Sequence, residues 1–154
     1  MRIYIDCEFN GFDGELITMA LVTKDNNIFY ERLACHKYTP WVEQYVVPHI
    51  KNMKVLSLIE FQNKLENYLS QFKKINIIAD WPVDISYFCK MLITPNICTR
   101  INTPPLRMEI LRLDSESKIP HDALEDAKAL CLKHNEFVPE STVLRKKYVN
   151  NEKK

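Results

Sequence analysis

The first 23 residues contain the pattern that most limits how this chain can fold. Residues 2–9 alternate between apolar and polar side chains, which is the two-residue period of a β-strand. The apolar face consists of Ile3, Ile5, Cys7 and Phe9, and the other face of Arg2, Tyr4, Asp6 and Glu8. Residues 15–23, ELITMALVT, are apolar on both faces and rich in strand-forming residues. We therefore expect them to form a buried strand in the middle of a sheet.

The remaining sequence predicts how this sheet continues. The turn-forming residues KDNN precede NIFYERLA, a third strand that completes an antiparallel meander. Further patterns predict helices within 39–50, 58–72 and 82–93, a buried strand at 74–80, a fifth strand at 106–113, and a last helix over 122–134. The predicted fold class is α/β, with a mixed sheet of three antiparallel strands followed by parallel strands, flanked by helices.

Composition limits the class of protein. A chain of 154 residues has the size of one domain, which we place at 1–139, followed by a basic C-terminal tail at 140–154. Five cysteines without CxxC spacing argue against a disulfide framework or a zinc ribbon, so a reducing, cytoplasmic location is expected. Because no apolar run approaches about 20 residues, we expect no membrane partner. The net charge of +1 does not by itself indicate a nucleic-acid-binding protein.

Two acids lie on one face of the first predicted strand. Asp6 and Glu8 are two residues apart, so their side chains leave the same face about 6.5 to 7 Å apart along the backbone. Two carboxylates in this arrangement can share a metal ion. The alternative is that they are the solvent-exposed acids of an edge strand.

The start of the last helix contains a second candidate group. Asp122 and Glu125 have the spacing of a capping box, which puts His121 just before the helix and Asp126 in its first turn. Asp126 is expected at the margin of the buried helix face, where an acid needs a partner. Small side chains at Ala123 and Ala127 would let this helix approach the sheet closely. A simpler interpretation is that Asp126 only interacts favourably with the helix dipole.

A third pair of acids occurs at the end of a predicted parallel strand. Asp80 ends that strand and Asp84 falls in the first turn of the next helix. Ligands of open α/β sheets tend to bind at this edge. One of the two acids is expected to cap the helix, and Asp80 is the preferred candidate for that cap.

The segments DCE, DWPVD and HDALED, in this order, resemble the three motifs of the DEDDh 3′-to-5′ exonucleases, a group with RNase H-like folds. That group includes oligoribonuclease, ribonuclease T and proofreading subunits, and this chain is most similar to its short exoribonuclease AS branch. By this resemblance the metal ligands would be Asp6, Glu8, Asp84 and Asp126, and His121 would be the general base. The second motif of the group usually has Asn where this chain has Asp80.

The resemblance also implies an activity. Two Mg²⁺ or Mn²⁺ ions would support hydrolysis of phosphodiester bonds from the 3′ end, releasing nucleoside 5′-monophosphates. The expected partner is single-stranded RNA or a short oligonucleotide, contacted by Phe9, Gly11 and Phe12. The alternatives are an exodeoxyribonuclease and a non-catalytic nucleic-acid-binding module on the same fold. A homodimer is a further open alternative.

Overall fold

The computed structural model describes residues 1–95 and 99–137. The predicted basic tail at 140–154 lies outside these residues. Within the described part of the chain, one sheet has the strand order β4-β3-β2-β1-β5-β8. Its strands are β1 (Arg2–Phe9), β2 (Leu16–Thr23), β3 (Ile28–Leu33), β4 (Val55–Leu56), β5 (Ile75–Ala79) and β8 (Leu106–Ile110).

The directions of the strands agree with the sequence pattern. The strands β1, β2 and β3 pair antiparallel, whereas β1, β5 and β8 pair parallel. The prediction of an α/β fold with a mixed sheet is therefore confirmed. Three two-residue strands were not predicted, because they are too short to show a period: β4, which pairs parallel with β3, and the small hairpin of β6 (Ile93–Thr94) and β7 (Thr99–Arg100).

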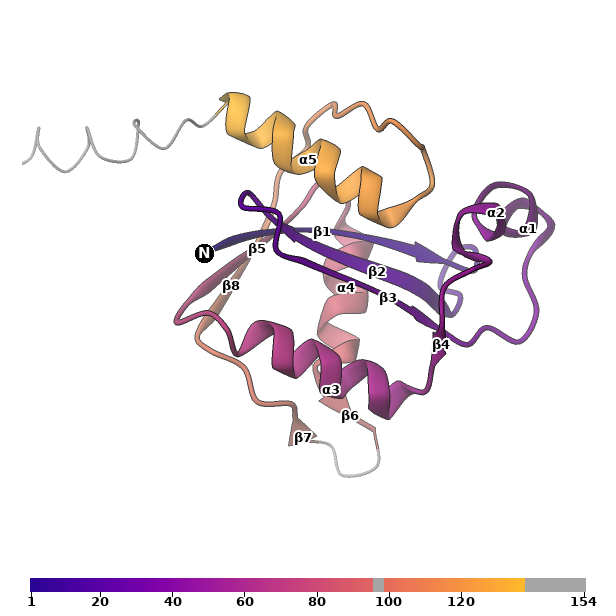
Figure 1. Ribbon diagram of the computed structural model, residues 1–154, viewed down its shortest axis with the longest axis horizontal. Helices are drawn as coiled ribbons and strands as arrows, with labels where there is room; N and C mark the ends of the chain where they lie inside the picture. The colour runs from indigo at the N-terminus through magenta and orange to yellow at the C-terminus, as the bar shows by residue number, and fades with distance from the viewer. Residues whose placement is uncertain (96–98, 138–154) are drawn as a thin grey trace, which may run out of the picture.

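Helices lie on both faces of the sheet (Figure 1). The helices are α1 (Pro40–Tyr45), α2 (Val47–Ile50), α3 (Leu58–Leu69), α4 (Pro82–Met91) and α5 (Ala123–Phe137). One face is covered by α5 and the other by α3 and α4, while α1 and α2 stand beside the end of the sheet toward which β1 runs. The structure thus has three layers, and the carboxyl end of β1 opens toward α1.

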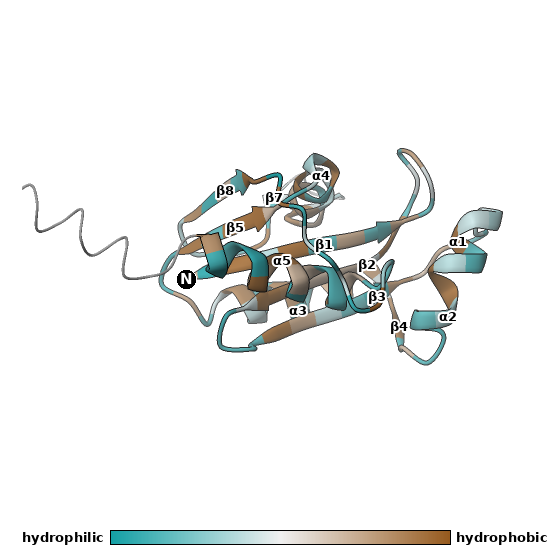
Figure 2. Cartoon of the chain, turned by 90° about the horizontal axis from the view of Figure 1, so that it is seen from above, coloured by the Kyte–Doolittle hydropathy of each residue, from teal (hydrophilic) through white to brown (hydrophobic). Residues whose placement is uncertain are grey.

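The two faces of the sheet bury different kinds of side chain. The α3 and α4 side contains the larger hydrophobic cluster, which includes Phe61, Leu65 and Phe88. On the opposite face, Ala123 and Ala127 pack fully buried against β2, as the small side chains predicted. Figure 2 shows α5 with both brown and teal segments, in keeping with a helix that buries one side. This close packing fixes the position of the first turn of α5 over β1 and β2.

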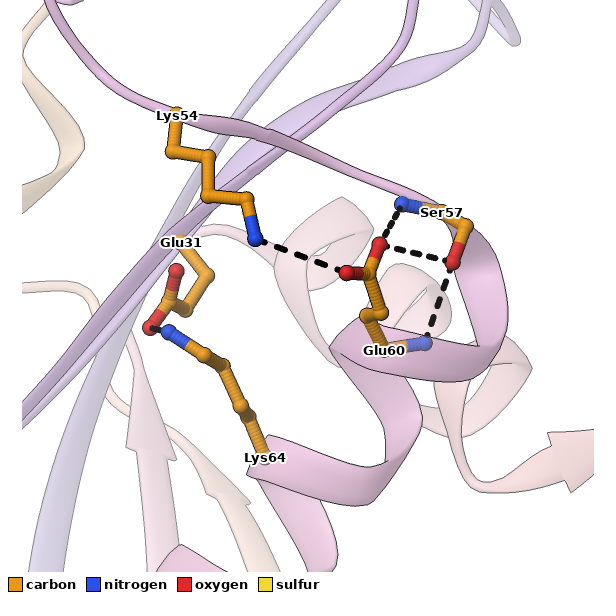
Figure 3. Close-up of polar contacts among 5 residues, drawn as sticks. All are labelled: Glu31, Lys54, Ser57, Glu60 and Lys64. Atoms are coloured by element: carbon orange, nitrogen blue, oxygen red, sulfur yellow. Dashed lines mark hydrogen bonds and ion pairs between the residues drawn. The ribbon is translucent and has the colours of Figure 1, made fainter.

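A capping box fixes the start of α3 (Figure 3). The Ser57 hydroxyl accepts a hydrogen bond from the Glu60 N–H at 3.3 Å, and the Glu60 carboxylate accepts one from the Ser57 N–H at 2.9 Å. Lys54 also pairs with Glu60, and Lys64 connects α3 to Glu31 of β3. A cap of this kind is worth about 1 kcal/mol. The cap thus stabilises the first turn of α3.

The described residues bear on two features that composition addressed, the state of the cysteines and the presence of a membrane-spanning helix. Four cysteines in this part of the chain are free. Among the described residues, no helix has the length and apolar character needed to span a lipid bilayer.

Candidate metal centre

An irregularity at the end of β1 shapes the candidate site. Glu8 pairs with Thr18 and Phe9 with Leu16, so Ile17 is an extra residue on β2 at this point. Bulges of this kind bend a strand and re-aim its side chains. Ile17 is fully buried against Val42 and Val46, which places α1 next to the end of β1. The bulge therefore connects the position of the acids on β1 with that of α1.

Five carboxyl groups meet at this end of the sheet. Oxygens of Asp6, Glu8 and Asp126 lie within 4.8 Å of one another, and so do oxygens of Asp6, Asp80 and Asp84. Asp6 belongs to both groups. The structure thus brings together the four acids that the sequence suggested as ligands, and it adds Asp80.

These acids have unusual protonation behaviour. Burial, reinforced by the charges of Asp84 and Glu8, raises the pKa of Asp6 well above its ordinary value. Burial and the charge of Asp126 raise the pKa of Glu8 to about 8, and burial and the charge of Asp80 raise that of Asp84 to about 8. Burial also raises the pKa values of Asp80 and Asp126. Without a cation, the folded chain holds protons here that free carboxyl groups would release at neutral pH.

One carboxylate oxygen has no partner at all among the described residues. Asp84 is only 1% exposed, and its Oδ2 atom makes no hydrogen bond. A buried, unpaired acceptor of this kind is costly, and natural structures seldom keep one without a protein group, an ordered water or an ion beside it. A donor set of carboxylate oxygens alone suits hard cations such as Mg²⁺ and Mn²⁺. The residues present therefore fit a divalent cation.

The start of α5 holds Asp126 and His121 together. The Asp122 carboxylate accepts hydrogen bonds from the N–H groups of Leu124 at 3.0 Å and Glu125 at 3.3 Å, so Asp122 caps the helix as predicted. The reciprocal half of the predicted capping box does not form, because the Glu125 carboxylate pairs with Lys128 at 2.6 Å. A different bond takes its place. The backbone N–H of His121 donates to Asp126 Oδ2 at 3.1 Å.

The imidazole of His121 is held by two aromatic rings of α1. Its ring centroid lies 4.8 Å from that of Trp41 and 6.1 Å from that of Tyr45, in both cases edge to face. The backbone of His121 is left-handed, with φ of 67°. Such a conformation is uncommon for residues other than glycine, although histidine is among the more tolerant. The left-handed turn and the α1 rings together determine where the imidazole lies.

The loop between β1 and β2 contains both glycines of the chain. Gly11 has φ of 77°, and a side chain at Gly14 would place its Cβ 2.0 Å from the carbonyl oxygen of Asn10. Both glycines are therefore required by the shape of the loop itself. The Asn10 side chain ties the loop to the segment before α1, donating to the Lys37 carbonyl at 2.6 Å and accepting from the Thr39 N–H at 2.8 Å.

The three predicted substrate-contacting residues differ in their surroundings. Phe12 is 98% exposed. Phe9 is partly buried and stacks on Tyr87 at a centroid distance of 5.1 Å. Both line a cleft of about 640 Å³, together with Gly11 and the acids Asp6, Glu8, Asp84 and Asp126.

The cleft also contains residues for which the sequence suggested no role. Beside His121, for which the sequence suggested the role of general base, the wall contains Trp41, Trp81, Tyr87 and Lys90. Lys90 lies over the Tyr87 ring and pairs with Asp13 at 3.7 Å. The aromatic residues of 39–50 were visible in the sequence as part of a short helix, but only the fold shows which of them face the acids.

One expectation about this region is wrong. Asp80 was expected to cap α4, but the N-cap residue is Trp81, and no side-chain cap bond is formed there. Asp84 does lie in the first turn of α4, as predicted. Asp80 sits one residue before the cap, and its carboxylate belongs to the acidic group with Asp6 and Asp84.

The sequence matches no model of a protein family, and none of the curated proteins matches it.

Proposed function

We propose that this chain is a metal-dependent 3′-to-5′ exoribonuclease. The observation that carries the proposal is that Asp6 belongs to two sets of converging carboxylates, beside a cleft that also contains the imidazole of His121. A structural role alone does not account for five converging acids, because like charges at this distance raise the free energy of the folded chain.

In the proposed reaction, two Mg²⁺ or Mn²⁺ ions would be held by Asp6, Glu8, Asp84 and Asp126. The cations would neutralise the carboxylates and stabilise charge on the phosphate oxygens. His121 would take the proton of the attacking water, a task for which histidine is well suited near neutral pH. Asp126 would act twice, as a ligand and as the acceptor for the His121 backbone N–H that anchors this turn.

The cleft wall supports a short, single-stranded substrate. The Phe12 side chain is free to stack on a base, since it is almost fully exposed, and Trp41 and Trp81 are each 48% exposed. Lys90 is the lysine in this wall, and its partner is Asp13. A cleft of this composition favours stacking over extensive phosphate contacts. The choice of RNA over DNA rests on the resemblance to the exoribonuclease AS branch.

The fold is compatible with this proposal. Three antiparallel strands followed by parallel strands are what the RNase H-like resemblance implies, and the acids lie at the carboxyl end of β1, which is central in the sheet.

Oligonucleotide degradation tests the proposal directly. Single-stranded RNA and DNA, labelled at either the 5′ or the 3′ end, are incubated with the chain and Mn²⁺ or Mg²⁺. The expected result with 5′-labelled RNA is a ladder of progressively shorter products. With 3′-labelled RNA, the label should appear at once as a mononucleotide. Asp126→Asn should be inactive, while Asp114→Asn, a change of an acid outside the cleft, should retain activity.

Each alternative gives a different result in this assay. Faster degradation of DNA would make the chain an exodeoxyribonuclease. Binding of the oligonucleotides without any degradation would make it a binding module. Internal cleavage would contradict the 3′-to-5′ direction.

A further inference from the structure

Asp80 is the acid to which neither the sequence motifs nor the proposed reaction assigns a role. Its place follows from the register of the sheet. β1 and β5 run parallel with Tyr4 beside Ile78. Two residues further along the chain come Asp6, which is still in β1, and Asp80, which directly follows the last residue of β5. Tyr4 and Ile78 point to the same face, since both belong to one cluster under α5. Asp6 and Asp80 continue that alternation, so strand geometry directs both carboxylates to the same place.

Asp84 reaches this place from another element. It lies in the first turn of α4, where the helix dipole favours an anion. Oxygens of Asp6, Asp80 and Asp84 lie within 4.8 Å of one another, and Asp84 Oδ2 is buried without a partner. Three carboxylates that converge from two strands and a helix, one of them with an unpaired oxygen, form the donor set of a cation site.

Among the described residues, no lysine, arginine or histidine forms an ion pair with the Asp80 carboxylate. Arg112 lies instead over the Trp81 ring, with its guanidinium carbon 5.6 Å from the ring centroid. The geometry therefore leaves the Asp80 carboxylate available to a cation.

Asp80 also faces a second opening. A cavity of about 550 Å³ is lined by Asp6, Asp80, Asp126 and the segment that leads to α5, including Ser115, Glu116 and Ser117. Water and ions can thus reach Asp80 on a side of the acids different from the main cleft, of which Asp80 is not a lining residue.

We propose that Asp80 is a direct ligand of a divalent cation, which it holds together with Asp6 and Asp84, while Asp6, Glu8 and Asp126 hold the other. The inference deepens the proposed function, on which its catalytic meaning rests, but the site itself is a statement about cation binding. With Asp80 included, three carboxylates would be available to each of the two cations, and Asp6 would belong to both sets.

The test is titration of the metal-free chain with Mn²⁺ by isothermal calorimetry. The wild type should bind two Mn²⁺ per chain. Asp80→Asn should lose the second ion or bind it at least tenfold more weakly. The matched control is Glu116→Gln, which changes an acid of the same cavity outside both carboxylate groups and should bind two ions as the wild type does.

Melting of the same variants without metal shows that they are folded. Asp80→Asn should melt at or above the wild-type temperature, because it removes one of the converging charges. Unchanged stoichiometry and affinity in Asp80→Asn would overturn the proposal, and so would a wild type that binds fewer than two ions.

Failure of this inference can be told apart from failure of the proposed function. If the wild type degrades oligonucleotides and Asp80→Asn binds Mn²⁺ as the wild type does, only the proposed role of Asp80 is wrong. If Asp80→Asn loses one Mn²⁺ but the wild type degrades no nucleic acid, the cation site is established and the proposed exonuclease activity is wrong.

Discussion

The two ends of α5 meet β1 in opposite ways. Near the C-terminal end of the helix, His134 is buried and its Nδ1 atom lies 2.8 Å from the Tyr4 hydroxyl. At the N-terminal end, Asp126 meets Asp6 and Glu8, three groups of like charge. The first contact is complete within the protein, whereas the second needs something from outside it. One helix on one strand thus makes both a structural contact and a candidate site, and the difference lies in whether the polar groups satisfy each other.

The largest expected effect is on turnover, and it distinguishes His121, in the turn before α5, from His134, within α5. His121→Ala should lower turnover about a hundredfold or more, because the water loses its base, while Mn²⁺ binding stays nearly unchanged. His134→Ala should do the reverse, lowering the melting temperature and leaving turnover of the folded chain intact. Single-turnover kinetics and calorimetric Mn²⁺ titration measure both. Equal loss of turnover and of Mn²⁺ affinity in His121→Ala would show that His121 is a ligand or a structural residue.

The next effect is a dependence of stability on pH in the absence of metal. Folding raises the pKa values of Glu8 and Asp84 to about 8 from ordinary values near 4. Between these limits the folded chain binds more protons than the unfolded chain, so the free energy of unfolding falls as pH rises from about 4 to about 8. Each group contributes at most about 1.4 kcal/mol per pH unit. Urea unfolding in EDTA should therefore give a more stable protein at pH 5.5 than at pH 8.

At the C-terminal end of α5, the dependence of stability on pH has the opposite sign. Burial lowers the pKa of His134, so its contribution to stability is lost as pH falls below the ordinary histidine value of about 6.5. Asp84→Asn should reduce the loss of stability between pH 6.5 and 8 and leave the change caused by His134 in place. If Asp84→Asn and the wild type respond identically above pH 6.5, the acids do not carry raised pKa values.

A cation should remove the repulsion at the acidic end. Binding to the folded chain alone stabilises it by about 2.7 kcal/mol at a hundredfold excess over Kd, which is a rise of several degrees for a chain of this length. Millimolar Mn²⁺ or Mg²⁺ should therefore raise the melting temperature of the wild type. Asp6→Asn should raise the metal-free melting temperature and shrink the increase caused by metal. A wild type with no shift, measured beside a known two-metal nuclease that does shift, would show that the acids are not a metal site.

The smallest expected effect is on stability, and it concerns the hydrogen bond between Tyr4 and His134. Tyr4→Phe removes the hydroxyl and leaves His134 without that partner, at an expected cost of about 1 to 3 kcal/mol. Differential scanning calorimetry should show the same loss with and without Mn²⁺, and turnover should not change. A loss that disappears on addition of Mn²⁺ would mean that the two ends of α5 are coupled.

The sequence predicted most of the fold for physical reasons that can be named. The alternation of residues 2–9 and the apolar run of 15–23 identified β1 and β2, because burial imposes a period on side chains. The spacing of Asp122 and Glu125 identified the start of α5 correctly, because an acid at the N-cap accepts the first free N–H groups of a helix. Strand and helix positions singled out Asp6, Glu8, Asp84 and Asp126, the resemblance implied that they are ligands, and the structure brings them together.

What the sequence could not supply is mostly non-local. The bulge at Ile17 depends on how β2 pairs, and the contact of Trp41 with His121 depends on where α1 packs. Asp80 was misjudged as a cap because an acid before Pro82 resembles one locally. Its neighbour Asp6 is adjacent only through the register of two strands that are distant in sequence.

The left-handed backbone of His121 affects which substitutions at this position selection would tolerate. At φ of 67°, glycine is the substitution that removes steric strain, which for other residues costs about 1 to 2 kcal/mol. Part of that gain would be offset by the extra freedom of glycine in the unfolded chain. Selection for stability alone would therefore favour or tolerate His121→Gly, the change that deletes the imidazole. Among descendants of this sequence, glycine at position 121 would mark lineages in which the imidazole is no longer under selection.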